Sequence, residues 1–455
     1  MTAEQQGKQY NKMTDEPIVS LLVKLSIPTV ISMMITNVYN LVDTAFVGTL
    51  GTSESGATGI VFGYMSILQA FAFMCGQGAG SIMSRRLGAK DLEEAKKYSS
   101  TGFFLSFFFG FLLAAISMVF MKPLLYALGS TETIAVYAEK YLFYIMLYAP
   151  FFTSSLTMNN LLRYEGKAVL GTIGLTIGAF LNILGDIVFI FLFKMGIAGA
   201  GLATAISQFI SFCILLGMFL LKKTQTRISI RYFARDFKTI WMILATGFPS
   251  LLRQSLNSVA AVLLNNAAGI YGDEAIAAMS IVSRVSFFPM AVAIGIGQGF
   301  QPISSFNYGA GKKERVRKGF WSAFIMAEIV LLVMSVPIIL FSGGIIKQFR
   351  NDPDVIEIGI RALRLMGIGQ LFVPLTMLVE MGYQSIGEKL LACFASSLRS
   401  GILFIPTLLI LKNVRGLSGI QEAQPLSFVF AFFVSIFLCR IYLKKLKPEL
   451  FTAVE

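Results

Sequence analysis

Apolar runs of roughly 20 residues, the length that spans a bilayer as a helix, recur along the whole chain and constrain its fold most. Examples are FFLSFFFGFLLAAISMVF at 103–120 and SFVFAFFVSIFLC at 427–439. Apolar residues make up 55% of the chain and charged residues 14%, whereas soluble domains have roughly 45–50% and about 25%. The sequence therefore predicts an all-α, multispanning membrane protein.

Twelve spans are predicted, and most of the 38 Lys and Arg residues lie on one side of them, in tails and loops such as 85–97, 222–238 and 312–318. The positive-inside rule then places both termini in the cytoplasm and the protein in the cell membrane. The net charge of +13 indicates attraction to anionic membrane lipid and requires no nucleic acid. The polar first 17 residues indicate that no cleavable signal precedes the first span. The spans lie at about 18–48, 56–84, 99–121, 134–158, 168–193, 198–221, 239–270, 275–305, 318–341, 355–383, 390–411 and 426–443.

The chain repeats itself at an offset of 221 residues. Residues 28–97 align with 249–318 without a gap, and Gly76-Gln77-Gly78 pairs with Gly297-Gln298-Gly299. Because the matched loops 88–97 and 309–318 lie on the same side, the two halves run in the same direction through the membrane. Two parallel six-helix lobes are typical of secondary transporters, which bind substrate between lobes and alternate its access.

This repeat gives the predicted domain organisation. It consists of a cytoplasmic tail at 1–17, an N-lobe at 18–221, a basic cytoplasmic linker at 222–238, a C-lobe at 239–443 and a cytoplasmic tail at 444–455.

Two carboxylates lie inside spans of the N-lobe, where an ionisable side chain is costly and usually marks function. Asp43 in span one and Asp186 in span five lie roughly 9 and 12 Å from the outer ends of their helices. Tyr39 lies one turn from Asp43, Asn182 lies one turn from Asp186, and Thr204 enters span six at a comparable depth. We expect these oxygen-bearing side chains to surround one small cation.

Two ions suit this chemistry. Sodium prefers oxygen ligands, which Asp43, Asn182, Asp186 and Thr204 supply. Alternatively, two neighbouring carboxylates cannot both ionise cheaply in an apolar wall, so one carries an exchangeable proton. The competing structural interpretation is that Asp43 and Asp186 only bond to neighbouring helices.

The C-lobe carries its own buried charges. Arg253, Arg284 and Arg399 lie inside spans seven, eight and eleven, and Glu328 and Glu380 lie inside spans nine and ten. One interpretation is a gate or a contact for anionic substrate groups. The favoured one is internal ion pairing that holds helices in register, since buried charges are seldom left unpaired.

The stretch VDTAFVG at 42–48, the NxxxD of Asn182 and Asp186, Thr204 and the twelve-span repeat resemble the multidrug and toxic compound extrusion family of cation-coupled exporters. In that family an N-lobe cluster forms the cation or proton site, and the resemblance assigns this role to Tyr39, Asp43, Asn182, Asp186 and Thr204. A branch of the family carries a Glu where this chain has Asn257, so the resemblance does not imply coupling by that route through the C-lobe.

The predicted function is therefore an antiporter that exports organic cations or drugs in exchange for sodium ions or protons. The alternative is a flippase for a lipid or polyprenyl-linked substrate, and a channel is a weaker third. Because histidine and a Walker A stretch are both absent from the sequence, we expect neither an enzyme nor a nucleotide-binding protein. We expect no cofactor beyond the coupling ion, contact with membrane lipid, and a monomer.

Overall fold

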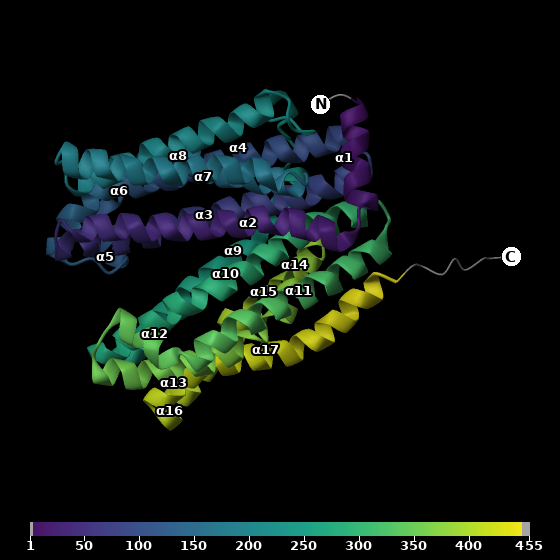
Figure 1. The fold of residues 1–455 in the computed structure, drawn as a ribbon. Coiled ribbons are helices and arrows are strands. Elements are labelled where there is room, and N and C mark those ends of the chain that lie inside the picture. The colour runs from purple at the N-terminus through teal and green to yellow at the C-terminus, as the bar shows by residue number, and fades with distance from the viewer. Residues whose placement is uncertain (1–2, 448–455) are drawn as a thin grey trace. The chain divides into compact units, whose positions relative to one another are not determined.

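The structure is a computed structural model that describes residues 3–447, and every regular element in that range is helical (Figure 1). The first half contains α1 (Ala3–Asp15), α2 (Ile18–Gly48), α3 (Thr52–Gly88), α4 (Leu92–Val119), α5 (Met121–Ala127), α6 (Glu132–Tyr164), α7 (Ala168–Asp186), the π-helix η1 (Ile187–Leu192), α8 (Ile197–Leu220) and the 3-10 turn η2 (Ile230–Tyr232). The second half contains α9 (Phe237–Gly269), α10 (Asp273–Gly309), α11 (Lys313–Leu340), α12 (Ser342–Phe349), α13 (Pro353–Gln370), α14 (Val373–Ile386), α15 (Lys389–Ser397), the π-helix η3 (Leu398–Ile402), α16 (Phe404–Arg415) and α17 (Leu417–Lys445).

Each predicted span corresponds to one of these helices or to a run of adjoining ones. Among residues 3–447, nine stretches are long and apolar enough to cross a membrane, and the pair α13 and α14 makes a tenth. The other two predicted spans correspond to α6 and α9, two helices of 33 residues each. The all-α membrane fold is confirmed, and each of the twelve predicted spans has a helical counterpart among the described residues.

The 221-residue repeat is visible in the helix boundaries. Adding 221 to the ends of α3, 52 and 88, gives 273 and 309, the ends of α10. The same shift carries α4 at 92–119 onto α11 at 313–340, and the first residue of α5 onto that of α12. The two halves therefore have the same order of helices along the chain, as the repeat predicts.

Span ten differs from the single helix expected at 355–383. It consists of α13 and α14, which are bent by 47° at a short break. Pro374 lies in the first turn of α14, where a proline is tolerated because its missing N–H would have no partner there. Two membrane-spanning stretches also contain π-helical turns, η1 after Asp186 and η3 around Arg399.

Helices extend into both predicted tails. The N-terminal tail predicted at 1–17 contains α1, and α17 continues to Lys445 inside the predicted C-terminal tail. The rest of that tail, at 448–455, lies outside the described residues.

Contacts divide the chain into two compact units. Unit 1 contains the chain up to Lys12 and Ile31–Leu251, and unit 2 contains Met13–Val30 and the chain from Leu252 onward. The first part of α2 thus belongs to unit 2, and the first part of α9 belongs to unit 1. The predicted lobes at 18–221 and 239–443 keep both helices whole, and their boundaries stay a prediction.

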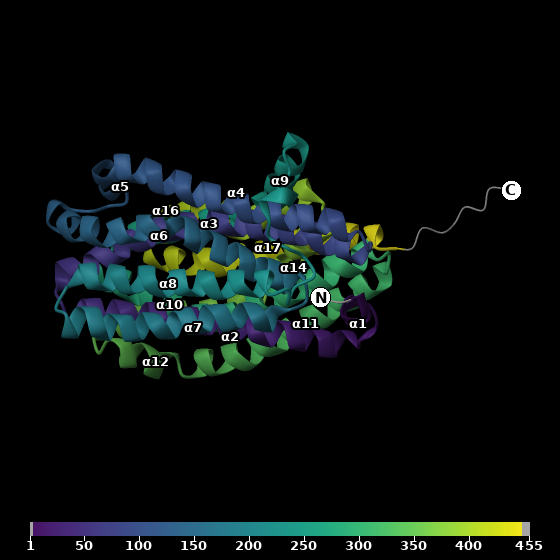
Figure 2. The same cartoon turned by 90° about the horizontal axis from the view of Figure 1, so that it is seen from above.

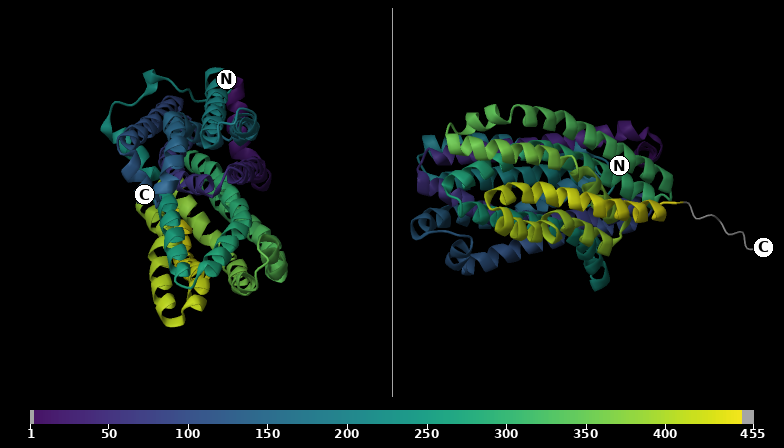
Figure 3. Two further views of the ribbon diagram at one scale, coloured as in Figure 1. Left: turned by 90° about the vertical axis from the view of Figure 1, so that its left-hand side faces the viewer. Right: turned by 90° about the horizontal axis from the view of Figure 1, so that it is seen from below.

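Unit 1 is a bundle in which α6 lies at the centre. This helix packs on α3, α4, α7 and α8, and Figure 2 shows α7 and α8 side by side along it. Its core is rich in aromatic side chains, including Tyr64, Tyr141, Tyr148 and Phe152. In unit 2, α10 packs on α11, α13 and α14, and α17, in yellow in Figure 3, packs on α13, α14 and α16.

Glycines allow the first part of α9 to pack closely in unit 1 and the first part of α2 to pack closely in unit 2. In unit 1, a Cβ on Gly78 of α3 would lie 2.9 Å from the backbone nitrogen of Gly247 in α9. In unit 2, a Cβ on Gly299 of α10 would lie 2.9 Å from the Cα of Ser26 in α2. Both pairs are related by the repeat, so the GQG sequences serve close helix packing.

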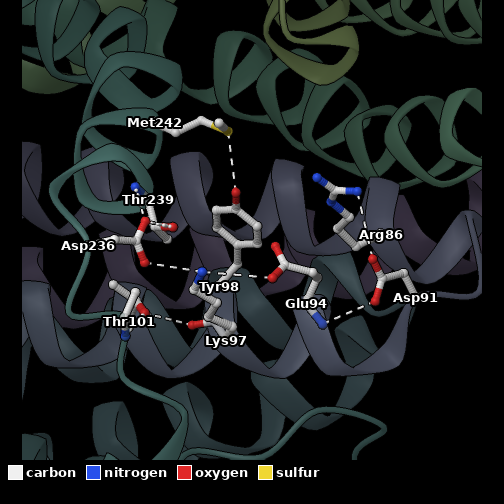
Figure 4. Close-up of polar contacts among 10 residues, drawn as sticks. Arg86, Asp91, Glu94, Lys97, Tyr98, Thr101, Asp236, Thr239 and Met242 are labelled. Atoms are coloured by element: carbon white, nitrogen blue, oxygen red, sulfur yellow. Dashed lines mark hydrogen bonds and ion pairs between the residues drawn. The ribbon is translucent and has the colours of Figure 1, made fainter.

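The linker between the halves is fixed to unit 1 at its end (Figure 4). The Asp236 carboxylate accepts hydrogen bonds from Thr239 N at 2.9 Å and Thr239 Oγ1 at 2.5 Å, and it pairs with Lys97 Nζ at 3.2 Å. The bonds from Thr239, followed by the contact with Lys97, hold the pKa of Asp236 below its ordinary value. Tyr98 of α4 also donates to the sulfur of Met242 at 3.3 Å. The start of α9 is therefore capped and tied to α4.

The beginning of the linker is fixed by Glu165, whose side chain is fully buried. Its carboxylate accepts from the backbone nitrogens of Thr226 at 2.8 Å and Gln225 at 3.0 Å, and from the Thr226 hydroxyl. Between these two points, Ser100 of α4 donates to the carbonyl of Arg227 at 2.7 Å. These hydrogen bonds therefore hold the linker against unit 1.

Candidate functional site

The five side chains predicted for the N-lobe cluster all lie in unit 1 and are all buried. Tyr39 and Asp43 come from α2, Asn182 and Asp186 from α7, and Thr204 from α8. Asn182 and Asp186 have no exposed surface. The two residues of α2 share one face, as do the two residues of α7, because each pair is spaced by about one turn.

Hydrogen bonds link the cluster residues in two pairs of helices, α7 with α8 and α6 with α2. Asn182 Nδ2 donates to Thr204 Oγ1 at 3.0 Å, and Thr204 Oγ1 donates to the carbonyl of Ala200 at 3.0 Å. The hydroxyl of Tyr141, on α6, donates to Asp43 Oδ2 at 3.3 Å. The structure therefore brings the amide and the hydroxyl together and adds a tyrosine that holds Asp43.

The carboxyl groups of Asp43 and Asp186 lie within hydrogen-bonding reach of each other. When both are ionised they are acceptors only, so neither can bond to the other. In that form both oxygens of Asp186 and Oδ1 of Asp43 have no hydrogen-bond partner among the described residues. A proton on either carboxyl would supply the missing donor, and a cation between them would serve the same oxygens.

The unpartnered atoms are all oxygens that can receive a cation. Besides the carboxylate oxygens, Oδ1 of Asn182 is buried without a donor in the described chain. Four buried acceptors in one place are costly unless something positive joins them. The set suits one sodium ion or one proton. Residues 3–447 contain no group of three or more acidic or cysteine side chains that could hold a more strongly bound metal.

The helix carrying Asp186 changes its winding at the site. Regular α-helix ends at Asp186, and η1 continues the span with π-helical turns from Ile187 to Leu192. Short π-helical segments of this kind occur mostly within α-helices and are frequent at functional sites. The position of Asp186 at this transition distinguishes it from an ordinary packing residue.

Tyr141 is the residue that the sequence interpretation missed. Its hydroxyl, and not that of Tyr39, donates to Asp43 in the structure. Tyr39 lies near Asp43, and Tyr148 lies near both. Tyrosines at 137, 141, 144 and 148 recur in this span, but their spacing does not indicate a partner on another helix.

The charges predicted in the C-lobe are only partly paired. Arg253 Nη1 of α9 and Glu380 Oε1 of α14 form a buried ion pair at 2.5 Å, as the ion-pairing interpretation predicts. Near this pair the half-buried guanidinium of Arg399 lies over the ring of Phe428, 5.9 Å from its centroid. Asn257 accepts a hydrogen bond from Ser400 at 2.5 Å.

The remaining two predicted C-lobe charges are less buried than expected. Arg284, which we expected to be buried, has an exposed side chain on α10, and Glu328 of α11 is half-buried. The prediction of burial is wrong for Arg284 because this residue lies on the face of α10 that is exposed at 283, 284, 287 and 288. Of the predicted C-lobe residues, the structure therefore brings together Arg253, Glu380 and Arg399, and it places Asn257 against Ser400, next to Arg399 in the chain.

Comparison with known proteins points to one family. A sequence model of the family described as MatE matches residues 28–188 and 249–410. The multidrug export protein MepA of Staphylococcus saprophyticus is 26% identical over 408 residues, which cover 88% of each chain. An outward-facing structure of a multidrug resistance MATE family transporter of the MOP superfamily is 24% identical, covers 95% of this chain and 98% of that one, and has a TM-score of 0.89. A structure of a MOP superfamily transporter from Pyrococcus furiosus, described with a binding pocket of reversed polarity, is 24% identical, covers 97% of this chain and 99% of that one, and has a TM-score of 0.91.

Proposed function

Because the chain belongs to the MatE family, we propose that it exports organic cations or drugs by antiport, in exchange for sodium ions or protons. The similar proteins are export proteins and transporters, so the chain is a multi-pass membrane transporter and not an enzyme. The observation that carries the proposed coupling is the buried pair of Asp43 and Asp186 with its unpartnered oxygens.

Coupling follows from the charge of this pair. Without an ion or proton, the two carboxylates repel each other across α2 and α7. A cation that enters is held by Asp43, Asp186 and the carbonyl oxygen of Asn182, which draws these helices together. A ligand that binds one arrangement of helices better than another shifts the protein toward it. The bound ion therefore favours one access state, and the alternating-access cycle releases the drug in the other.

The proposed site needs no cofactor besides the coupling ion. We place the protein in the cell membrane as a monomer, with both termini and the docked linker in the cytoplasm, following the positive-inside rule. The driving ion then enters from outside, where the site lies nearer the surface, and substrate leaves the cell.

A second candidate, a flippase for an anionic lipid-linked substrate, is favoured by the charge of unit 2. Arg253, Arg399 and Glu380 together carry an excess of positive charge in its interior. Since Glu380 is paired with Arg253, Arg399 is left to attract an anionic group. An organic cation gains nothing from this cluster.

Dye transport in everted vesicles tests the proposal. The vesicle lumen corresponds to the cell exterior, so we expect ethidium to accumulate in vesicles loaded with sodium or acidified inside. Comparing the two gradients identifies the coupling ion. Accumulation that requires neither gradient would refute antiport. Transfer of a fluorescent anionic lipid between leaflets, without ethidium accumulation, would favour the flippase.

A further inference from the structure

A basic cavity lies between α1 and the start of the linker, away from the carboxylate site. Its volume is about 510 Å³, and its lining residues are Gln5, Lys8, Gln9, Lys12, Lys222 and Lys223. Each of these side chains can donate hydrogen bonds, and none is acidic. A hollow with four ammonium groups and two amides has the chemistry of an anion site.

The wall formed by α1 is held in place. Gln9 Nε2 donates to the carbonyl of Glu165 at 2.9 Å, and Lys90 Nζ lies 4.7 Å from the centroid of the Tyr10 ring. On the opposite wall, Lys167 Nζ donates to the carbonyl of Lys223. The lysines are therefore presented by two fixed segments of unit 1.

Two acidic side chains near the cavity have defined partners in the described chain. Glu165 is buried and bonded to Thr226 and Gln225, and its ion pair is with Lys167 at 3.8 Å. Glu4 pairs with Lys8 at 2.6 Å, but exposed pairs of this kind contribute little. Burial lowers the pKa of Lys167; Glu165 opposes that shift, and the charge of Lys12 adds to it.

The surface next to the lysines is apolar and exposed. Leu220 and Leu221, which immediately precede Lys222, are 63% and 72% exposed. They end the α8 span, at the level where a bilayer changes from acyl chains to headgroups. Basic clusters directly beside the end of a membrane helix attract anionic headgroups, while a free anion would gain nothing from the leucines.

We propose that this cavity binds the phosphate-bearing headgroup of an anionic membrane lipid, whose acyl chains lie against Leu220 and Leu221. The phosphate neutralises the repulsion among the lysines and bridges α1 to the linker. This site is independent of the proposed export function, because it lies at the end of the bundle and shares no residue with the carboxylate cluster.

Thermal unfolding of the full chain in neutral detergent tests the site. The probes are phosphatidylglycerol, phosphatidylcholine with the same acyl chains, and inorganic phosphate. We expect phosphatidylglycerol to raise the unfolding temperature saturably and the other two to have little effect. Equal effects of the two lipids, or an equal effect of inorganic phosphate, would overturn the proposal.

Matched variants locate the binding. Changing Lys8, Lys12, Lys222 and Lys223 to Gln should weaken the apparent phosphatidylglycerol affinity at least tenfold, while changing the same four to Arg should preserve it. A control with the same loss of charge changes four lysines that do not line the cavity to Gln, namely Lys122, Lys194, Lys347 and Lys412. The unfolding temperature without lipid shows that each variant is folded. Parental affinity in the cavity variant would refute the assignment.

Discussion

Replacing Asp43 with Asn tests the carboxylate pair most directly, because it preserves the shape of the side chain and removes its charge. Asp43 and Asp186 lie within hydrogen-bonding reach of each other in a buried cluster. Two like charges about 4 Å apart repel by about 4 kcal/mol at an effective dielectric constant of about 20. An ion or proton that binds between them relieves repulsion of this size, roughly a thousandfold in affinity. In Asp43→Asn that relief is absent.

The assay compares ethidium efflux per unit of membrane-inserted protein, and the unfolding temperature with and without the coupling ion. We expect efflux in Asp43→Asn to collapse while the protein level and the ion-free unfolding temperature hold or rise, because a neutral amide is cheaper to bury. The parent should be stabilised by the ion, by about 2.7 kcal/mol at a hundred times its Kd. The variant should lose that stabilisation.

A matched control is Glu328→Gln, which removes the charge of a half-buried carboxylate on α11 in unit 2. This variant should retain ion-dependent efflux and ion-dependent stabilisation. Near-parental efflux in Asp43→Asn would refute the coupling site. Equal losses in both variants would show that the effect is not specific to the pair.

Four further predictions concern the contacts around the site and the linker. Asn182→Ala and Thr204→Ala should each weaken the apparent ion affinity of efflux roughly tenfold, about 1.4 kcal/mol, without reducing membrane-inserted protein; unchanged ion dependence would contradict their role. Tyr141→Phe removes the donor to a buried carboxylate and should lower the free energy of unfolding by about 1.5–3 kcal/mol, unlike a tyrosine that only packs. Glu165→Gln should lower the free energy of unfolding, measured by denaturant titration, by roughly 1.5–3 kcal/mol and should expose the linker to protease. Parental protease resistance would argue that Glu165 does not hold the linker against unit 1. The folded-state pKa of Asp236 is lowered, so the stability that its charge contributes is complete above pH of about 4 and is lost as pH falls through the folded-state pKa. The difference in unfolding temperature between Asp236→Ala and the parent should therefore shrink below pH of about 4.

The membrane fold could be predicted because its signals are local. Apolar length gives the spans, and the 221-residue offset gives the parallel halves. The break between α13 and α14 could not be placed, because Pro374 can start a new helix or bend an existing one. The short helices α5 and α12 lie at the ends of apolar runs, where hydropathy alone does not distinguish a continuing span from a turn.

The candidate site could be assembled from the sequence because Asp43 and Asp186 are conspicuous in apolar helices and each has a polar neighbour one turn away. Tyr141 could not be assigned, since its partner Asp43 is 98 positions away and tyrosines are common in membrane helices. The pairing of Arg253 with Glu380 across 127 positions was likewise beyond reach of spacing rules. Such contacts depend on which helices are neighbours, and only the three-dimensional structure supplies that.

The exchange of the first parts of α2 and α9 has a consequence for the origin and dissection of the chain. Neither half contains a whole unit of its own, because residues 13–30 belong with the second half and the start of α9 belongs with the first. If the repeat arose by duplication of one gene, its single-copy ancestor would have been a domain-swapped dimer, in which the first part of the first spanning helix of each subunit packed on the other subunit. A chain cut within the linker would yield two fragments that must be expressed together, because each completes its partner.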